Sequence, residues 1–255
     1  MKPNTIEHKY PLEKLAPEGR IGVVALATDF NIEEDLRRMY PDTVTAFTSR
    51  VRNTNPLTIE NLRRMAPGIT DTADTILPGT KMDAIIYACT SGTVAIGIDR
   101  ITELVQKARP GVPVTNPVTA ALKAFEHFKA RKISILTPYT EAVNEDVAAL
   151  FAEMGVEVLS ISGFGFEDDT AMTYITPQDI KEAALSCCHA DADLLFISCT
   201  ALRASLILDE IEEQLDKPVV SSNQALAWHS LQLAGYQKPV SGFGRLLHAL
   251  TGTRA

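Results

Sequence analysis

Two cysteines occupy matching positions in the two halves of this chain. Cys89 ends the apolar run 85–88 and is followed by Thr-Ser-Gly-Thr, while Cys199 ends the run 195–198 and is followed by Thr-Ala-Leu. After each cysteine the sequence changes to a helical pattern. A thiol at the end of a buried strand, just before a helix, can be both reachable and acidic, because a helix N-terminus carries partial positive charge. We therefore expect two thiols that face each other across one cleft.

Two thiols on opposite sides of one carbon atom can perform two-base chemistry. A thiolate is a good base and a strong nucleophile. One thiolate can remove the proton α to a carboxylate while the other thiol returns a proton from the opposite side. Alternatively, one thiolate adds to an activated double bond, the C–C bond rotates, and the sulfur leaves, which gives cis–trans isomerisation. The enolate-like intermediate of the first reaction needs fixed donors that stabilise its charge.

Hydroxyl groups near the two cysteines are the candidate donors. Together with the free N–H groups of the helix that begins near position 91, they could form a nest for a carboxylate or another small anion. Asp29, after the first expected strand, is a further substrate-binding candidate, and it could equally cap the helix that begins near Ile32. The candidate hydroxyl residues are Thr90, Ser91, Tyr139 and Thr200.

Other motifs are weaker candidates for a catalytic or binding role. Arg50 and Arg52 could hold a substrate carboxylate in a bidentate ion pair, or could form a solvated loop. Cys187 and Cys188 come late in an expected helix, and we interpret them as packing or surface thiols. The chain has no CxxC or HExxH motif and its histidines are scattered, so we expect no metal site. The segment 163–165 lacks the third glycine of a dinucleotide-binding fingerprint.

The elements that position these residues are apolar, β-branched runs that alternate with helical patterns. Because the runs are almost continuously apolar, they indicate parallel strands covered by helices on both faces, in an α/β fold. We expect strands at 21–26, 43–47, 84–88, 112–115, 133–137, 157–161, 194–198 and 218–221.

The two halves of the chain repeat this pattern coarsely, which predicts two similar α/β lobes related by duplication. The expected first lobe covers residues 1–117 and is completed by residues 218–255, which cross back to it; the second lobe covers 118–217. In open parallel sheets, ligands bind beyond the carboxyl ends of the strands. Both cysteines lie at such ends, so we expect the site between the lobes.

Composition limits the possible partners and location. The 255 residues carry a net charge of −8, which argues against nucleic acid and acidic membrane surfaces as partners. No apolar run has the length of a membrane span, and residues 1–20 are polar, without the apolar region of a secretory signal. We therefore expect a cytoplasmic protein whose cysteines are reduced thiols.

Four segments resemble the aspartate/glutamate racemase superfamily, in particular the branch that holds maleate cis–trans isomerase, arylmalonate decarboxylase and the ectoine-utilisation protein EutA. The resemblance covers nearly the whole chain. It implies two α/β lobes with the site between them, no cofactor, a small carboxylate substrate and a homo-oligomer. The segments are Ala88–Thr93, Leu136–Tyr139, Gly163–Phe166 and Ser198–Leu202.

By this resemblance, Cys89 and Cys199 are the catalytic pair, and Thr90, Ser91 and Tyr139 lie in the carboxylate pocket. Two cysteines favour a racemase or cis–trans isomerase over a decarboxylase, which needs only the second cysteine as proton donor. The segment Ala88–Thr93, with the sequence Ala-Cys-Thr-Ser-Gly-Thr, is most similar to the ectoine-utilisation group, which implies an amino-acid-like ectoine breakdown product as substrate. Maleate isomerases carry an asparagine after the first strand, whereas this chain has Ala-Thr-Asp there. A decarboxylase, a small-anion binding protein and a redox sensor remain the alternatives.

Overall fold

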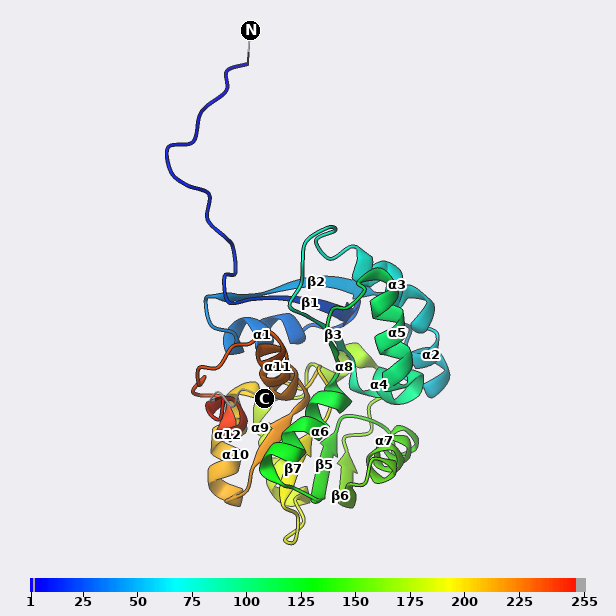
Figure 1. Cartoon of the computed structure of the whole chain (residues 1–255). Coiled ribbons are helices and arrows are strands. Elements are labelled where there is room, and N and C mark those ends of the chain that lie inside the picture. Colours follow the sequence, from blue (N-terminus) through cyan, green and yellow to red (C-terminus); the bar gives the residue numbers. More distant parts are fainter. Residues whose placement is uncertain (2, 251–255) are drawn as a thin grey trace.

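The computed structural model describes Met1 and residues 3–250, and within these residues eight parallel strands form two four-stranded sheets (Figure 1). The strand order is β2-β1-β3-β4 in the first sheet and β6-β5-β7-β8 in the second. This confirms the predicted α/β fold of two parallel sheets. The strands are β1 (Gly19–Leu26), β2 (Val44–Val51), β3 (Ala84–Ala88), β4 (Val114–Thr115), β5 (Lys132–Thr137), β6 (Glu157–Gly163), β7 (Leu194–Ile197) and β8 (Val219–Ser221).

Helices cover both sheets, and the central strands are therefore buried on both faces. All residues of β3 and β7 are buried, as their unbroken apolar sequences predict. The helices are α1 (Ile32–Met39), α2 (Ile59–Arg63), α3 (Ala66–Asp74), α4 (Thr90–Ile96), α5 (Ile98–Ala108), α6 (Pro117–Phe128), α7 (Glu141–Glu153), α8 (Asp169–Met172), α9 (Pro177–Cys187), η1 (Ser205–Ile207), α10 (Leu208–Leu215), α11 (Ser222–Leu233) and α12 (Gly244–His248).

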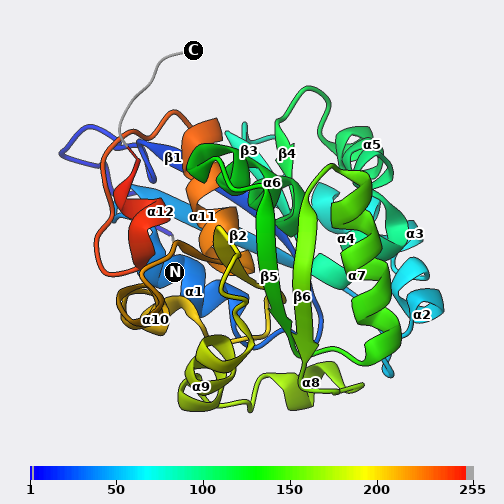
Figure 2. The ribbon, with the colours of Figure 1, turned by 90° about the horizontal axis from the view of Figure 1, so that it is seen from below.

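The crossing between the two halves begins one strand later than expected. Strand β8 pairs with β7 in the second sheet, so residues 219–221 do not belong to the first lobe. The chain crosses only with α11, which packs against α1, α6 and β3 (Figure 2). A short strand whose last residue directly caps the next helix explains the difference, because Ser221 both ends β8 and caps α11.

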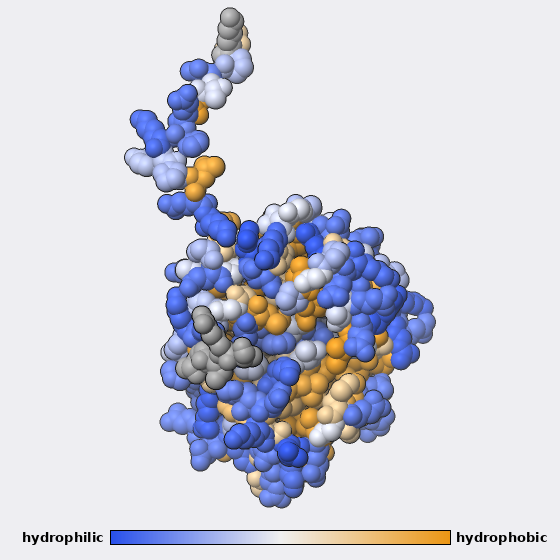
Figure 3. Space-filling model, in the orientation of Figure 1, coloured by the Kyte–Doolittle hydropathy of each residue, from blue (hydrophilic) through white to orange (hydrophobic). Residues whose placement is uncertain are grey.

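Residues before β1 extend away from the body of the molecule, and the arm is hydrophilic with scattered apolar residues (Figure 3). Ile6, Tyr10, Leu12 and Leu15 are exposed there. In the part of the chain that the structure describes, no helix is long and apolar enough to cross a membrane.

Candidate active site

Cys89 follows β3 and caps α4. Its Sγ accepts the backbone N–H of Gly92 at 3.1 Å and lies 3.7 Å from the hydroxyl of Ser91. The first turn of α4 forms there because Thr93 donates both its backbone N–H and its hydroxyl to the carbonyl of Cys89. The sequence Thr-Ser-Gly-Thr therefore gives the first sulfur two polar neighbours at the edge of the buried hydrophobic core.

Cys199 follows β7 in a strained conformation. Its φ of 102° lies in the left-handed region that non-glycine residues rarely adopt. The conformation is held by two hydrogen bonds, from the Cys199 backbone N–H to the hydroxyl of Ser222 at 3.0 Å and from the Ala201 N–H to Sγ at 3.4 Å. Strain of this kind persists where the surroundings enforce it, and it clusters at functional sites.

The two cysteine segments are joined directly across the lobes. The hydroxyl of Ser222, which accepts from Cys199, lies 3.0 Å from the hydroxyl of Thr90. The hydroxyl of Thr200 reaches within 3.5 Å of the carbonyl of Ala88, the residue before the first cysteine. The strand ends that carry the sulfurs therefore meet in one place, as the sequence predicts.

Tyr139 is positioned by the turn after β5. Its backbone N–H donates to the hydroxyl of Thr137 at 3.0 Å, and that hydroxyl donates to the Asn144 side chain at 2.6 Å. The Tyr139 side chain is 1% exposed, and its hydroxyl lacks a hydrogen bond of normal geometry in the described residues. Burial, and the charge either cysteine would carry as a thiolate, raise the pKa of this hydroxyl, which lies near both sulfurs.

Asp29 joins the lobes and caps α1. One carboxylate oxygen accepts the N–H groups of Asn31 and Ile32 at 2.7 and 2.9 Å, and the other accepts the hydroxyl of Thr200 at 2.8 Å. Burial raises the pKa of Asp29. Both carboxylate oxygens are occupied by the protein, and the capping role weighed for this residue is present.

The thiols are less acidic than the sequence suggests. Cys89 and Cys199 are only 4% and 6% exposed, and burial raises the pKa of Cys89 to about 12 and that of Cys199 further. The N–H of Gly92 lowers the pKa of Cys89, but burial and the nearby carboxylate of Asp169 outweigh it. The expectation of reachable, acidic thiols was therefore wrong for the free protein, because both sulfurs are buried.

Asp169, at the start of α8, is the acidic group that influences both sulfurs. After burial, its negative charge is the largest cause that raises the pKa of Cys89 and of Cys199. The side chain is 3% exposed, accepts a hydrogen bond from the Thr28 hydroxyl, and has its own pKa raised to about 6, mainly by burial. Its backbone N–H donates to the Asn55 side chain at 3.2 Å, so the second half of the chain contacts the first half here.

Tyr87 and Gly92 shape the wall beside Cys89. Tyr87 is fully buried in β3 and its hydroxyl has no partner among the described residues. A Cβ atom on Gly92 would lie 2.5 Å from the Tyr87 hydroxyl and 2.9 Å from the Cys89 sulfur. Only glycine therefore fits between these two groups at this position.

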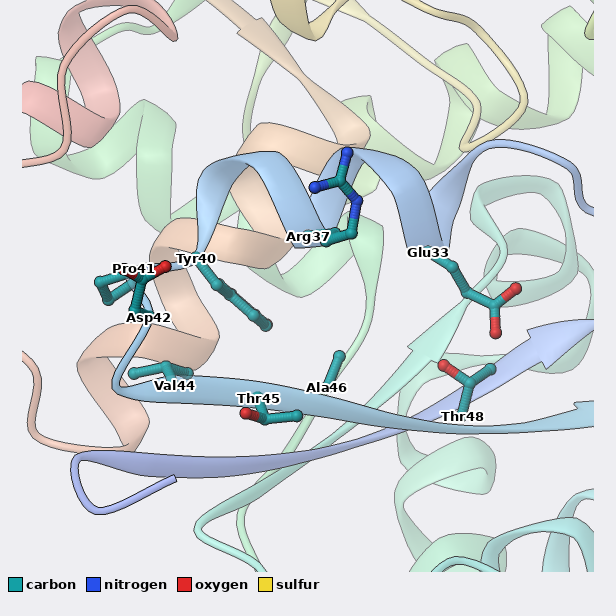
Figure 4. A pocket seen from close by; sticks show the side chains of 9 residues that line it. All are labelled: Glu33, Arg37, Tyr40, Pro41, Asp42, Val44, Thr45, Ala46 and Thr48. Atoms are coloured by element: carbon teal, nitrogen blue, oxygen red, sulfur yellow. The ribbon is translucent and has the colours of Figure 1, made fainter. Parts of the chain in front are cut away.

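The remaining sequence candidates lie outside this site. The guanidinium of Arg50 is occupied by the carbonyls of Leu26 and Asp29, at 3.2 and 2.7 Å, and by the carboxylate of Glu33. A pocket of about 460 Å³ between α1 and β2 contains none of the predicted site residues (Figure 4). Across residues 1 and 3–250, no group of three or more His, Cys, Asp or Glu side chains could hold a metal ion.

Comparison with known proteins gives the family. The family model described as arylmalonate decarboxylase matches residues 21–247. The chain belongs to this family. This confirms the branch predicted from the cysteine segments, within which maleate isomerases are also relatives.

The relatives within and around the arylmalonate decarboxylase family include two activities. An arylmalonate decarboxylase from Bordetella bronchiseptica is 31% identical over 139 residues, which cover 53% of this chain and 58% of that protein. A maleate isomerase from Alcaligenes faecalis is 23% identical over 246 residues, with coverage of 89% and 96%. The structure of a Nocardia farcinica maleate cis–trans isomerase mutant with a covalently bound succinylcysteine intermediate superposes with a TM-score of 0.82 at 20% identity, covering 90% of this chain and 98% of that one.

The sequence did not predict four polar residues that lie around the two cysteines in the structure: Tyr87, Thr28, Asp169 and Ser222. A signal existed for Tyr87, because it lies two residues before Cys89 and so on the same face of β3. Thr28 precedes Asp29 directly. Asp169 and Ser222 carry no comparable signal, since contacts between the two halves of the chain place both of them.

Proposed function

We propose that this chain is a racemase or cis–trans isomerase that acts on a small carboxylate with two cysteines and no cofactor. Cys89 and Cys199 are the catalytic pair. One observation supports the proposal: strand ends from two sheets bring the two cysteine segments together, linked through Thr90 and Ser222, and both sulfurs act on the buried hydroxyl of Tyr139. The maleate isomerase relatives support an isomerase. In the Nocardia enzyme, the succinylcysteine intermediate is the adduct expected when a cysteine sulfur adds to maleate.

The two sulfurs have different surroundings, which suggests a division of roles. Each sulfur has two donors that lower its pKa, the Gly92 N–H and the Ser91 hydroxyl at Cys89, and the Ala201 N–H and the Tyr139 hydroxyl at Cys199. We assign the nucleophile to Cys89, because its sulfur accepts an N–H at the N-terminus of α4, where the helix dipole favours negative charge. In racemisation, one sulfur takes the α-proton and the other thiol delivers its own proton to the opposite face. In cis–trans isomerisation, the Cys89 thiolate adds to the double bond and leaves after rotation.

The hydroxyls of Ser91 and Tyr139 are the groups best placed to stabilise the intermediate. The Tyr139 hydroxyl is buried, has no protein partner of normal geometry, and lies near both sulfurs. A preorganised donor that is free in the resting site can stabilise the charge that develops on a substrate carboxylate. Thr90 and Thr200 have a smaller share in substrate binding, because their hydroxyls are already engaged within the protein. The Thr90 hydroxyl contacts Ser222, and the Thr200 hydroxyl donates to Asp29.

We extend the proposal to the substrate and the setting on the basis of the sequence resemblance. The substrate is amino-acid-like or maleate-like, with an ectoine breakdown product as the amino-acid-like candidate. The protein works in the cytoplasm as a homo-oligomer. Its first lobe covers residues 1–117 and is completed from the C-terminal segment, and its second lobe covers residues 118–217 with β8 added.

Serine variants test the proposal. Cys89→Ser and Cys199→Ser should each abolish racemisation or isomerisation while circular dichroism shows an intact fold, whereas Cys187→Ser, at a thiol outside the site, should retain full activity. For racemisation in D₂O, deuterium should enter the α position, and each catalytic variant should still exchange the α-proton of one enantiomer only. Full turnover by either variant would refute the two-cysteine mechanism.

A decarboxylase is the second candidate, favoured by the family match and by the 31% identical relative. In that case Cys199 alone would deliver a proton to the carbanion left by loss of CO₂. Cys89→Ser would then retain most of the activity toward an arylmalonate, and Cys199→Ser would lose it. The same two variants therefore separate the two candidate functions.

A further inference from the structure

The carboxylate of Asp169 is buried without a positive charge to balance it. Among the described residues it takes part in no ion pair, and the hydroxyl of Thr28 is the side chain that donates to it. The charged groups that act on it are the carboxylates of Asp29 and Asp168, both of which add negative charge. A buried carboxylate of this kind is costly unless a cation or several donors compensate it.

A second feature of the site also indicates a missing ligand. The hydroxyl of Tyr87 is buried beside the Cys89 sulfur and finds no hydrogen-bond partner in the described part of the chain. The hydroxyl of Tyr139, also buried, has the Cys199 sulfur and the Ser91 hydroxyl near it, but no hydrogen bond of normal geometry. Buried polar groups are normally paired. The site thus offers unpaired hydroxyls, which suit a carboxylate, and an unbalanced carboxylate, which suits a cation.

We propose that Asp169 binds an ammonium group of the substrate, so that the site takes small amino acids or their close derivatives in preference to dicarboxylates such as maleate. This inference rests on the proposed function, because it places the substrate between Cys89 and Cys199. A substrate with a carboxylate and an ammonium group satisfies both kinds of unpaired group. A dicarboxylate instead brings a second negative charge toward Asp169, and like charges in a closed site repel strongly.

Binding of an ammonium group at Asp169 also has a chemical consequence. The charge of Asp169 is one of the causes that raise the pKa of both thiols. A bound cation offsets this charge, so the thiols become easier to ionise only when the correct substrate is present. The same contact therefore selects the substrate and activates the sulfur that attacks it.

The test is α-proton exchange in D₂O, followed by NMR, with two matched pairs of probes. L-2-Aminobutyrate is paired with (S)-2-methylbutyrate, and L-aspartate with methylsuccinate, so that a methyl group replaces the ammonium group in each pair. Because an ammonium group also acidifies the α-proton, the diagnostic quantity is the amino-to-methyl rate ratio in a variant relative to wild type.

Asp169→Asn should lower this ratio by about 10- to 100-fold, the value of a hydrogen bond to a charged group. Thr28→Val, which removes the hydroxyl that orients Asp169, should lower the ratio by a smaller factor and serves if Asp169→Asn folds poorly. Asp191→Asn removes an exposed carboxylate that does not act on Asp169, and it should leave the ratio unchanged.

Two results would overturn the inference and leave the proposed function standing: a ratio unchanged in both Asp169→Asn and Thr28→Val, or an equal loss of exchange for all four probes. Failure of the proposed function has a different signature. Wild-type protein would then exchange none of the four probes and would leave maleate unchanged, and the inference would fall with it.

Discussion

Thr90 and Ser222 are separated by 132 positions in the sequence, yet their hydroxyl oxygens lie 3.0 Å apart. Ser222 also accepts the backbone N–H of Cys199. One hydroxyl thus connects the residue after the first cysteine to the second cysteine itself. The distance between the two sulfurs depends on this connection, which makes Ser222 a positioning residue for the proposed reaction.

Replacement of Ser222 by alanine should lower both the folding free energy and kcat, and the two losses can be measured separately. Ser222→Ala leaves the Cys199 N–H without its acceptor and should cost about 1–2 kcal/mol of folding free energy. We expect kcat to fall by at least about tenfold, because the strained φ of Cys199 is then free to relax. Thermal unfolding and steady-state kinetics measure the two effects.

Ser230→Ala is the matched control for this variant. Ser230 lies on the same helix, is equally buried, and bonds the hydroxyl of Tyr40 at 2.6 Å, away from the cysteines. It should lose a similar amount of stability with kcat unchanged. Equal kcat values for Ser222→Ala and wild type would show that the connection between the lobes does not position Cys199.

Gly92→Ala should cause a large loss of activity, although it adds only one methyl group. The added Cβ would lie 2.5 Å from the Tyr87 hydroxyl and 2.9 Å from the Cys89 sulfur, so one of these groups must move. Overpacking of this kind costs about 1–3 kcal/mol. We expect activity to fall by at least about 100-fold, since a displaced sulfur loses its alignment with the substrate.

Gly68→Ala provides the comparison for that substitution. Gly68 lies in α3, and its added Cβ would meet only Val51, at 3.2 Å. Helix propensity favours alanine by about 0.5–1 kcal/mol, whereas the contact requires Val51 to shift by a few tenths of an ångström, so stability should change by at most about 1 kcal/mol and activity should not change. If Gly92→Ala behaved like Gly68→Ala, the tight wall beside Cys89 would have no role.

The pKa of Asp169 predicts an unusual dependence of stability on pH. Folding raises this pKa from 3.8 to about 6, so between these values the folded protein binds a proton that the unfolded chain does not. Stability therefore falls as pH rises from about 4 to 6, and the ionised carboxylate costs about 3 kcal/mol above pH 6. Asp169→Asn should recover much of this at pH 7–8 and none below pH 4.

Denaturant unfolding of wild type and Asp169→Asn at several pH values measures this difference. The exposed carboxylate of Asp191, which does not act on Asp169, supplies the control, because Asp191→Asn should show no gain that grows with pH. A gain of the same size at pH 4 and pH 8 in Asp169→Asn would mean that ionisation of Asp169 does not destabilise the fold.

Burial and raised pKa values predict slow alkylation of the site thiols. At pH 8, iodoacetamide should modify Cys188 and Cys187, which are partly exposed, well before Cys89 and Cys199. Asp169→Asn should speed modification of Cys89, because loss of the carboxylate charge removes a cause of its raised pKa. Peptide mass spectrometry over a time course gives each rate. Modification of Cys89 before Cys188 in the wild-type protein would contradict this picture.

The sequence predicts the scaffold of this site better than its electrostatics. All eight strands were expected near their observed positions, because continuous apolar runs need burial on both faces and leave few alternatives. The meeting of Cys89 with Cys199 followed from the rule that strand ends gather at one edge of a parallel sheet.

The rest of the site depends on contacts that no local pattern encodes. Contacts between the two halves of the chain position Asp169. The backbone N–H of Leu57 donates to the carbonyl of Glu167 at 2.8 Å, and the backbone N–H of Asp169 donates to the Asn55 side chain. Helix-terminus arguments predict a lowered pKa for Cys89, but burial reverses the sign. Burial of a thiol and the distance to a carboxylate from the other lobe are tertiary quantities.

The central claim is that the sulfurs of Cys89 and Cys199 act on one ligand from opposite sides. A crystal structure of the wild-type protein soaked with 2-aminobutyrate tests it most directly. We expect the amino acid between the two sulfurs, with its carboxylate at the Ser91 and Tyr139 hydroxyls. Sulfurs separated by packed side chains, with the amino acid bound elsewhere, such as the pocket between α1 and β2, would contradict the account.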